Sequence, residues 1–172
     1  GGFYRMEKIK HRQKNDNFSL GIRGLSNSTS TLNADAIQLL NYFGYTGRAH
    51  LTQYNGGTPL SDSLLGIKYV IDEADSVKLD NIYEHVSEIE NEDYKVYRNP
   101  YALSLAYGVS DGLLEFDMAE YSTFFDRFNS ILATMLDEDE SIDAFKPVAK
   151  MDAHRGNCKE VEMMTSLKYT AP

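Results

Sequence analysis

Apolar and polar residues alternate along several short stretches of the chain, and a period of two predicts β-strands. The clearest stretch is residues 67–71, Ile-Lys-Tyr-Val-Ile, where three of five residues are β-branched. We expect it to be a central, buried strand with Ile67, Tyr69 and Ile71 on one face and Lys68 and Val70 on the other. Further strands are predicted at residues 3–12, 18–25, 94–97, 103–109, 145–148 and 162–169.

Apolar residues at helical spacing predict two helices. Asn33 is a suitable N-cap for a helix that continues through about Phe43, and Gly44 is placed to end it. A longer helix is predicted over residues 119–136, where phenylalanines and aliphatic residues recur every three or four positions. The remaining segments are predicted to be a polar loop at 26–31, a long loop at 45–60, a short helical turn at 60–66 and a solvated acidic excursion at 72–93.

Strands and helices are intermixed along the sequence, which favours an α/β or α+β fold, with a mixed β-sheet and a few packing helices. The length of 172 residues fits a single domain with a substantial core. We assign this domain to residues 1–150 and treat residues 151–172 as a C-terminal tail that adds at most one further strand.

Charge is unevenly distributed around the net value of −9. Residues 1–24 carry a net charge of +4, and the rest of the chain carries −13. An acidic body repels phosphate groups, so nucleic acid is excluded as a partner. The basic start could face anionic lipid headgroups or teichoic-type polymers, or it could be the solvated face of a strand. No apolar run approaches the ~20 residues that span a bilayer, and no signal peptide is recognised at the start.

One motif suggests catalysis. Residues 108–112 match G-x-S-x-G, the pattern of a serine nucleophile on a sharp strand-to-helix turn, and Asp126 and His154 follow Ser110 in the chain order of hydrolases. The alternative is a strand end followed by an Asp-Gly turn. The single cysteine, Cys158, excludes an internal disulfide and a four-cysteine zinc site, and the four histidines are far apart in sequence, so no metal or cofactor is expected.

Three stretches, at residues 41–45, 58–71 and 96–107, together carry a resemblance. The most specific part is Leu-Leu-Gly-Ile-Lys-Tyr-Val-Ile at 64–71, followed about 28 residues later by Tyr-Arg-Asn-Pro-Tyr-Ala-Leu at 97–103. In order and spacing the chain resembles bacterial membrane proteins of the YfhO family over residues 4–148.

The resemblance implies a large polytopic membrane protein similar to the GT-C glycosyltransferases, which use polyprenyl-phosphate sugars outside the membrane. Members of the family are associated with glycosylation of cell-wall polymers such as lipoteichoic acid in Gram-positive bacteria. This chain would then be an extracytoplasmic domain at the cell membrane, soluble by itself and without the catalytic centre. Its expected partners are the rest of the same protein, the adjacent membrane surface and the acceptor glycopolymer.

With the resemblance in view, polar and aromatic residues become candidates for contact with a sugar, because glycans bind to aromatic faces flanked by fixed hydroxyl, amide and carboxylate groups. The alternative is that they only hold loops together. Three functions therefore stay open: an accessory domain that contacts glycan, a small serine hydrolase using Ser110, and a structural domain that packs on membrane helices. The candidate substrate-binding residues are Ser28, Asn33, Tyr45, Tyr54, Thr58, Lys68 and Asn99.

Overall fold

The computed structural model describes residues 2–73, 79–89, 91–137, 142, 144 and 145. It divides the chain into two compact units, residues 1–107 and 108–172, and each is described by itself. Within the described residues the predicted mixed sheet with a few helices is confirmed, in an α+β arrangement. The predicted strand at 162–169 and the tail at 151–172 lie outside the described residues.

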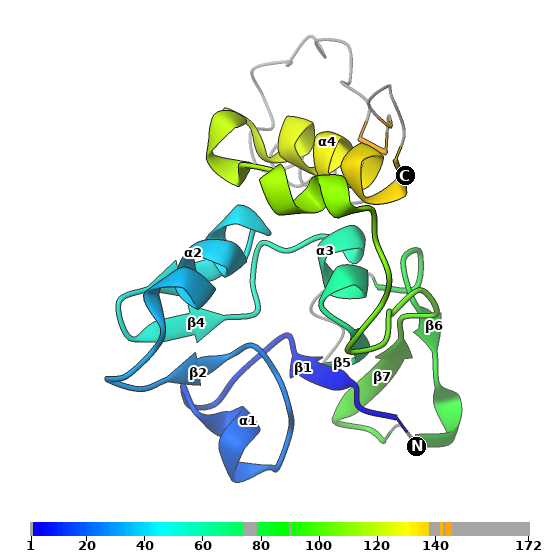
Figure 1. Ribbon diagram of the computed structural model, residues 1–172. Helices are drawn as coiled ribbons and strands as arrows, with labels where there is room; N and C mark the ends of the chain where they lie inside the picture. Colours follow the sequence, from blue (N-terminus) through cyan, green and yellow to red (C-terminus); the bar gives the residue numbers. More distant parts are fainter. Residues whose placement is uncertain (1, 74–78, 90, 138–141, 143, 146–172) are drawn as a thin grey trace, which may run out of the picture. The chain divides into compact units, whose positions relative to one another are not determined.

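A four-stranded mixed sheet forms the centre of the first unit (Figure 1). Its order is β1 (Arg5–Lys8), β5 (Ile67–Glu73), β7 (Tyr94–Arg98) and β6 (Glu84–His85). Strand β1 runs parallel to β5, and the other neighbours are antiparallel. The prediction that residues 67–71 form a central strand is therefore confirmed, and the strands predicted at 3–12 and 94–97 are present in shorter or slightly longer form.

A bulge in β5 changes which of its residues face the core. Arg5 pairs with Ile67, but Met6 pairs with Tyr69, so Lys68 is an extra residue on the β5 side. An inserted residue shifts the alternation of faces by one position. Ile67, Val70 and Asp72 are consequently buried, each with no exposed surface, whereas Ile71 is only half-buried. The predicted face shared by Ile67, Tyr69 and Ile71 is wrong for this reason.

Because of the bulge, we expect Ile67 and Ile71 to contribute differently to the free energy of unfolding. Replacing Ile67 by Ala should lower the free energy of unfolding by about 3 kcal/mol, because a fully buried aliphatic side chain leaves a cavity. Replacing Ile71 by Ala should cost roughly half as much, because its side chain already contacts solvent. Urea unfolding of both variants measures the difference. Equal losses would show that alternation continues through Lys68 without a shift.

A second, three-stranded antiparallel sheet has the order β2 (Asn27–Ser28), β4 (Leu51–Gln53) and β3 (Thr46–Arg48). Strands β3 and β4 form a hairpin inside the segment predicted to be a loop at 45–60, so that prediction is wrong. Gly47 lies inside β3, and Asn55, Gly56 and Gly57 follow the hairpin. Each strand has only three residues, too few for a visible period of two. Strand β2 likewise lies inside the polar loop predicted at 26–31.

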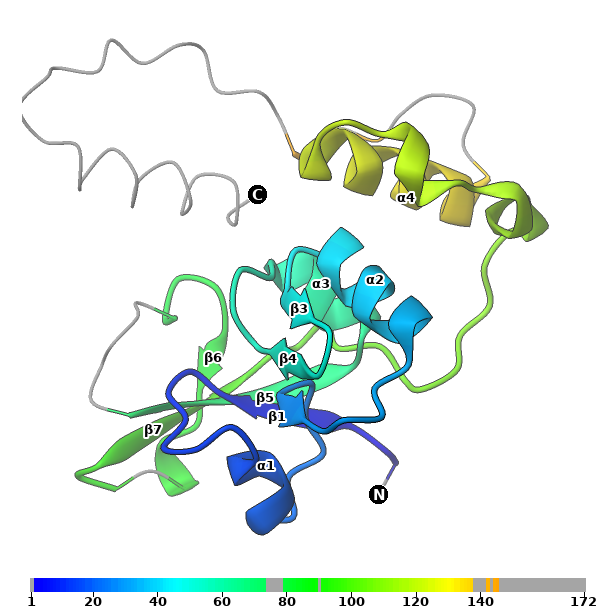
Figure 2. The same ribbon diagram turned by 90° about the vertical axis from the view of Figure 1, so that its left-hand side faces the viewer.

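Three helices pack around these sheets. Helix α2 (Ala34–Tyr42) begins as predicted, since the Asn33 side chain accepts a hydrogen bond from the Ala36 amide, and it packs on β3. Helix α3 (Pro59–Leu64) confirms the predicted turn at 60–66. Figure 2 shows α3 and the β3–β4 hairpin on one side of the β1–β5–β7 sheet and α1 (Asp16–Ser19) on the other.

Two segments of this unit differ from prediction. Residues 18–25 form no strand: the Asp16 carboxylate accepts hydrogen bonds from the Arg12 and Gln13 amides, helix α1 follows, and Gly21 turns the chain at a φ of 68°. The 72–93 segment is not wholly solvated, because its described residues include β6, the 3-10 helix η1 (Ser87–Ile89) and the buried side chains of Asp72, Leu79 and Tyr83.

The longest element among the described residues of the second unit is α4 (Phe124–Leu136), which lies within the helix predicted at 119–136. The Thr123 hydroxyl caps its first turn by accepting a hydrogen bond from the Asp126 amide. Two 3-10 helices precede it, η2 (Asp111–Glu115) and η3 (Met118–Glu120). The predicted strand at 103–109 is wrong. These residues are largely exposed, and none of them pairs with a strand of either sheet. Of the strand predicted at 145–148, only Phe145 is described, and it lies in a bend.

Candidate functional site

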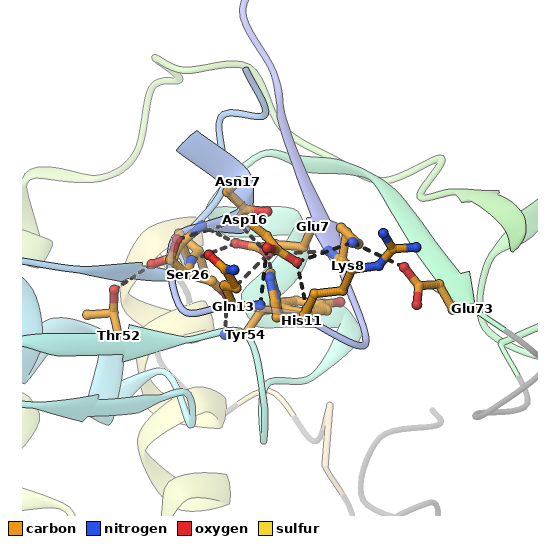
Figure 3. Close-up of polar contacts among 12 residues, drawn as sticks. Glu7, Lys8, His11, Gln13, Asp16, Asn17, Ser26, Thr52, Tyr54 and Glu73 are labelled. Carbon is orange, nitrogen blue, oxygen red and sulfur yellow. Dashed lines mark hydrogen bonds and ion pairs between the residues drawn. The ribbon is translucent and has the colours of Figure 1, made fainter. Parts of the chain in front are cut away.

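A buried carboxylate on β1 organises the loop that follows α1 (Figure 3). The side chain of Glu7 is completely buried. It accepts hydrogen bonds from the Leu25 amide, from the Ser26 amide at 2.8 Å and hydroxyl at 3.2 Å, and from the Asn17 side-chain amide at 3.0 Å. A Cβ at Gly24 would lie 2.3 Å from a Glu7 oxygen, so a glycine lets the loop close this tightly.

A second group of charges lies beside Glu7. The buried ammonium of Lys8 contacts the Asp16 carboxylate at 3.5 Å and the Glu73 carboxylate at 3.1 Å. The Asp16 pKa is lowered mainly by the hydrogen bond from the Arg12 amide, with a further contribution from Lys8. The imidazole Nε2 of His11 lies 3.5 Å from a Glu7 oxygen. Every charge of this group therefore has an opposite charge or a dipole against it.

A second buried carboxylate, Asp62 on α3, is surrounded by phenols. It accepts hydrogen bonds from the hydroxyls of Tyr45 at 2.5 Å, Tyr54 at 2.7 Å and Tyr83. Burial raises the pKa of Asp62 to about 6, although the three hydroxyls act in the opposite direction, and the negative charge of Glu7 raises it further. At pH 7 Asp62 is a carboxylate, and burial together with its charge raises the pKa of all three tyrosines.

The two carboxylates belong to one polar network. The backbone amide of Tyr54 donates a hydrogen bond to the Ser26 hydroxyl at 2.9 Å, and that hydroxyl donates to Glu7. The Thr52 hydroxyl donates to the Leu25 carbonyl at 2.5 Å. This network joins β1, the loop after α1, strand β4 and helix α3, so its immediate effect is to fix segments that are distant in sequence. Figure 3 shows the part of it around Glu7, Ser26 and Tyr54.

Helix α3 is itself held by two of the predicted site residues. Thr58 caps it, because its hydroxyl accepts a hydrogen bond from the Ser61 amide while the Ser61 hydroxyl accepts one from the Thr58 amide. The Asn99 side chain donates to the Ser63 hydroxyl and to the Ile67 carbonyl, both at 3.2 Å, and accepts from the Tyr101 amide. Both Thr58 and Asn99 are buried.

The seven predicted substrate-binding residues therefore divide into two groups. Tyr45, Tyr54, Thr58 and Asn99 gather around α3. The other three lie in different places. Ser28 in β2 is bonded through its backbone to the Asn15 side chain, Asn33 caps α2, and the Lys68 ammonium lies over the Tyr4 and Tyr69 rings at 5.4 and 5.7 Å.

Sequence reasoning missed the centres of the network, Glu7 and Asp62. An acidic residue in an alternating strand is expected to face solvent, and Glu7 carried no local signal against that expectation. Asp62 offered a weak signal. It lies in a helical turn among small and apolar residues, and a chain with 12 tyrosines must supply acceptors for the hydroxyls that it buries.

In the second unit, Ser110 has a structural role. Its hydroxyl accepts a hydrogen bond from the Gly112 amide at 3.3 Å and caps η2, and it lies 3.5 Å from Asp137. Residues 99–109, directly before it, form no strand, so the turn is not a nucleophile elbow. His154 lies outside the described residues. Across the described part of the chain, no cluster of three His, Cys, Asp or Glu residues could hold a metal ion.

Comparison with protein families places the chain in a class. A family model described as the bacterial membrane protein YfhO matches residues 1–168. The chain belongs to the YfhO family of bacterial membrane proteins, as its sequence motifs indicated. No curated protein and no solved structure matched the chain significantly. None of the helices in the ranges that the structure describes has the length and apolar character to cross a bilayer.

Proposed function

We propose that this chain is a non-catalytic, extracytoplasmic domain of a YfhO-family membrane protein, and that the whole protein is a glycosyltransferase similar to the GT-C class. In this proposal the whole protein transfers sugar from a polyprenyl phosphate to a cell-wall polymer such as lipoteichoic acid. The domain supports that reaction by holding a rigid surface next to the membrane part and the acceptor.

The observation that supports a non-catalytic role is that both buried carboxylates, Glu7 and Asp62, already accept several hydrogen bonds from within the domain. A general acid or base must reach the reacting group within hydrogen-bond distance. Glu7 already accepts hydrogen bonds from three backbone amides and two side chains, and Asp62 accepts three from phenols. Both groups are used in holding the fold together, which is what a scaffold requires.

A purely structural domain that packs on membrane helices is the second candidate. It is favoured by the fact that Tyr45, Tyr54, Thr58 and Asn99, proposed from the sequence as glycan contacts, direct their polar atoms to internal partners. The two candidates differ in one measurement. A domain that contacts the acceptor binds isolated lipoteichoic acid, and mild variants of the half-buried Ser28 weaken that binding. A packing domain does not bind the polymer.

The whole-protein proposal is tested in cells. Deleting the gene for the full-length protein should remove sugar substituents from lipoteichoic acid, measured by NMR of the purified polymer, and the intact gene should restore them. Unchanged substitution after deletion would contradict glycosyl transfer to this polymer.

Ser110 provides a separate prediction. We expect the purified chain to show no ester hydrolysis that depends on Ser110, because its hydroxyl caps η2 and is not presented on a strained turn. In the cell assay, the full-length protein carrying Ser110→Ala should retain all of its activity. Hydrolysis of a p-nitrophenyl ester that disappears in Ser110→Ala would instead establish the serine hydrolase.

A further inference from the structure

The structure separates the charges of the N-terminal segment into an inner and an outer set. Both acids of residues 1–24 point inward: Glu7 is fully buried, and the Asp16 side chain is 13% exposed and contacts Lys8. The basic residues Lys10, Arg12, Lys14 and Arg23 are all exposed. The charged side chains of this segment that are classed as exposed are therefore all positive.

Two large apolar side chains are exposed in the same segment. Phe18 on α1 is 88% exposed, and Leu20, directly after the helix, is 61% exposed. The segment is compact, because the Asp16 carboxylate holds the Arg12 and Gln13 amides at the start of α1 and the Ile22 amide donates to the Asn17 carbonyl after it. We call Lys10, Arg12, Lys14, Phe18, Leu20 and Arg23 the α1 patch.

We propose that the α1 patch docks on the surface of an anionic lipid bilayer. Basic side chains attract anionic headgroups, and exposed apolar side chains between them enter the interface. A soluble polyanion would use the positive charges but gives Phe18 and Leu20 no apolar environment, so their exposure favours a bilayer. The rest of the chain carries a net charge of −13, so an anionic surface repels it and attracts the N-terminal segment.

This inference depends on membership of a membrane-protein family and on the α1 patch, and it holds whether or not the whole protein transfers sugar. The docked domain would be tethered by its membrane part and oriented by the patch. The membrane part keeps the α1 patch close to the bilayer, so even a weak contact between the patch and the lipid surface forms often.

The first test measures binding of the 172-residue chain to vesicles of phosphatidylglycerol and phosphatidylcholine by flotation. We expect the chain to bind these vesicles at low salt and not vesicles of phosphatidylcholine alone. Each basic residue near an anionic surface changes partitioning about fivefold. Lys14→Glu should therefore weaken binding at least about fivefold, and the combined change of Lys10, Arg12 and Lys14 to Glu about a hundredfold. The matched control is Arg48→Glu, an exposed arginine on β3, which should change binding less than about twofold.

The second test asks whether the apolar part of the patch enters the interface. The chain contains no tryptophan, so Phe18→Trp introduces a single fluorescent reporter. Its emission should shift to shorter wavelength when anionic vesicles are added. Leu114→Trp is the control, because Leu114 is 89% exposed in the other unit and should show no shift.

Circular dichroism of each variant checks that the fold is kept, as expected for substitutions at exposed positions. The proposal is overturned if the chain does not bind anionic vesicles, if Lys14→Glu and Arg48→Glu weaken binding equally, or if the Phe18→Trp reporter does not shift. Binding to soluble polyglycerol phosphate without binding to vesicles would also overturn it and would assign the patch to a wall polymer.

Discussion

Replacing Glu7 by Ala should lower the free energy of unfolding by about 3–5 kcal/mol, the typical result of removing one partner from a buried charged network. The loss is large because the substitution leaves the Leu25 and Ser26 amides and the Asn17 side chain without their acceptor. A buried donor with no partner retains its full desolvation cost.

Urea unfolding measures this loss of free energy, and two further variants provide the comparison. Glu7→Gln keeps one oxygen acceptor and should lose less stability than Glu7→Ala. Glu84→Ala is the control for loss of a carboxylate at the surface, because the Glu84–Arg98 pair is about half exposed on both sides. An exposed ion pair contributes about 0–1 kcal/mol. If Glu7→Ala destabilised the protein no more than Glu84→Ala, the network would not be a determinant of the fold.

The second large effect is a dependence of stability on pH that originates in Asp62. Its pKa in the folded protein is raised to about 6 from the ordinary value of 3.8. Between these two values the folded state binds more protons than the unfolded state. Stability due to this residue therefore falls as pH rises from about 4 to about 6 and is constant above that range. The difference of about two pKa units corresponds to a loss on the order of 3 kcal/mol.

The measurement compares wild type with Asp62→Asn, whose amide does not titrate. The difference in unfolding free energy between the two proteins cancels the contributions of other groups that behave alike in both. It should fall between pH 4 and pH 6 and then stay level. The Asp16 pKa is lowered, so Asp16 acts with the opposite sign and at pH values below about 4. A wild-type profile parallel to that of Asp62→Asn would show that Asp62 has an ordinary pKa.

Regular elements were predictable from the sequence where a pattern was long or a terminal signal was strong. Helix α4 has thirteen residues with apolar positions at helical spacing, and α2 has Asn33 before it and Gly44 after it. Strand β5 was identified from its β-branched residues. These signals lie within each segment, so they can be recognised without knowledge of the tertiary structure.

The failed predictions have three causes. Strands β2, β3 and β4 have only two or three residues each, so their pairing is determined by partners and not by an internal pattern. Residues 18–25 and 103–109 alternate in sequence, but Phe18 and Leu105 are exposed, so the alternation does not reflect a buried face. The position of the Lys68 bulge depends on how β1 pairs with β5, about 60 residues away.

The candidate site was predictable only in part, for a related reason. Tyr45, Tyr54, Thr58 and Asn99 were selected for their chemistry, and the structure brings them together around α3. The residue that collects the three phenols, Asp62, was not selected, because its burial follows from the packing of α3 against β5 and not from its neighbours in sequence. Hydrogen-bond partners from four separate segments cannot be inferred from the spacing of residues in one chain.

The donors around Glu7 determine which sequence changes the loop after α1 can accept. Two of the four hydrogen bonds from this loop and α1 come from the backbone amides of Leu25 and Ser26. Every amino acid except proline supplies such an amide, so the hydrogen bond from residue 25 to Glu7 excludes only proline at that position. Position 24 has the opposite requirement, since the donors approach so closely that there is no room for a Cβ. Across the family, variation in this loop should therefore be limited by backbone shape, with glycine retained at 24 and proline absent at 25 and 26.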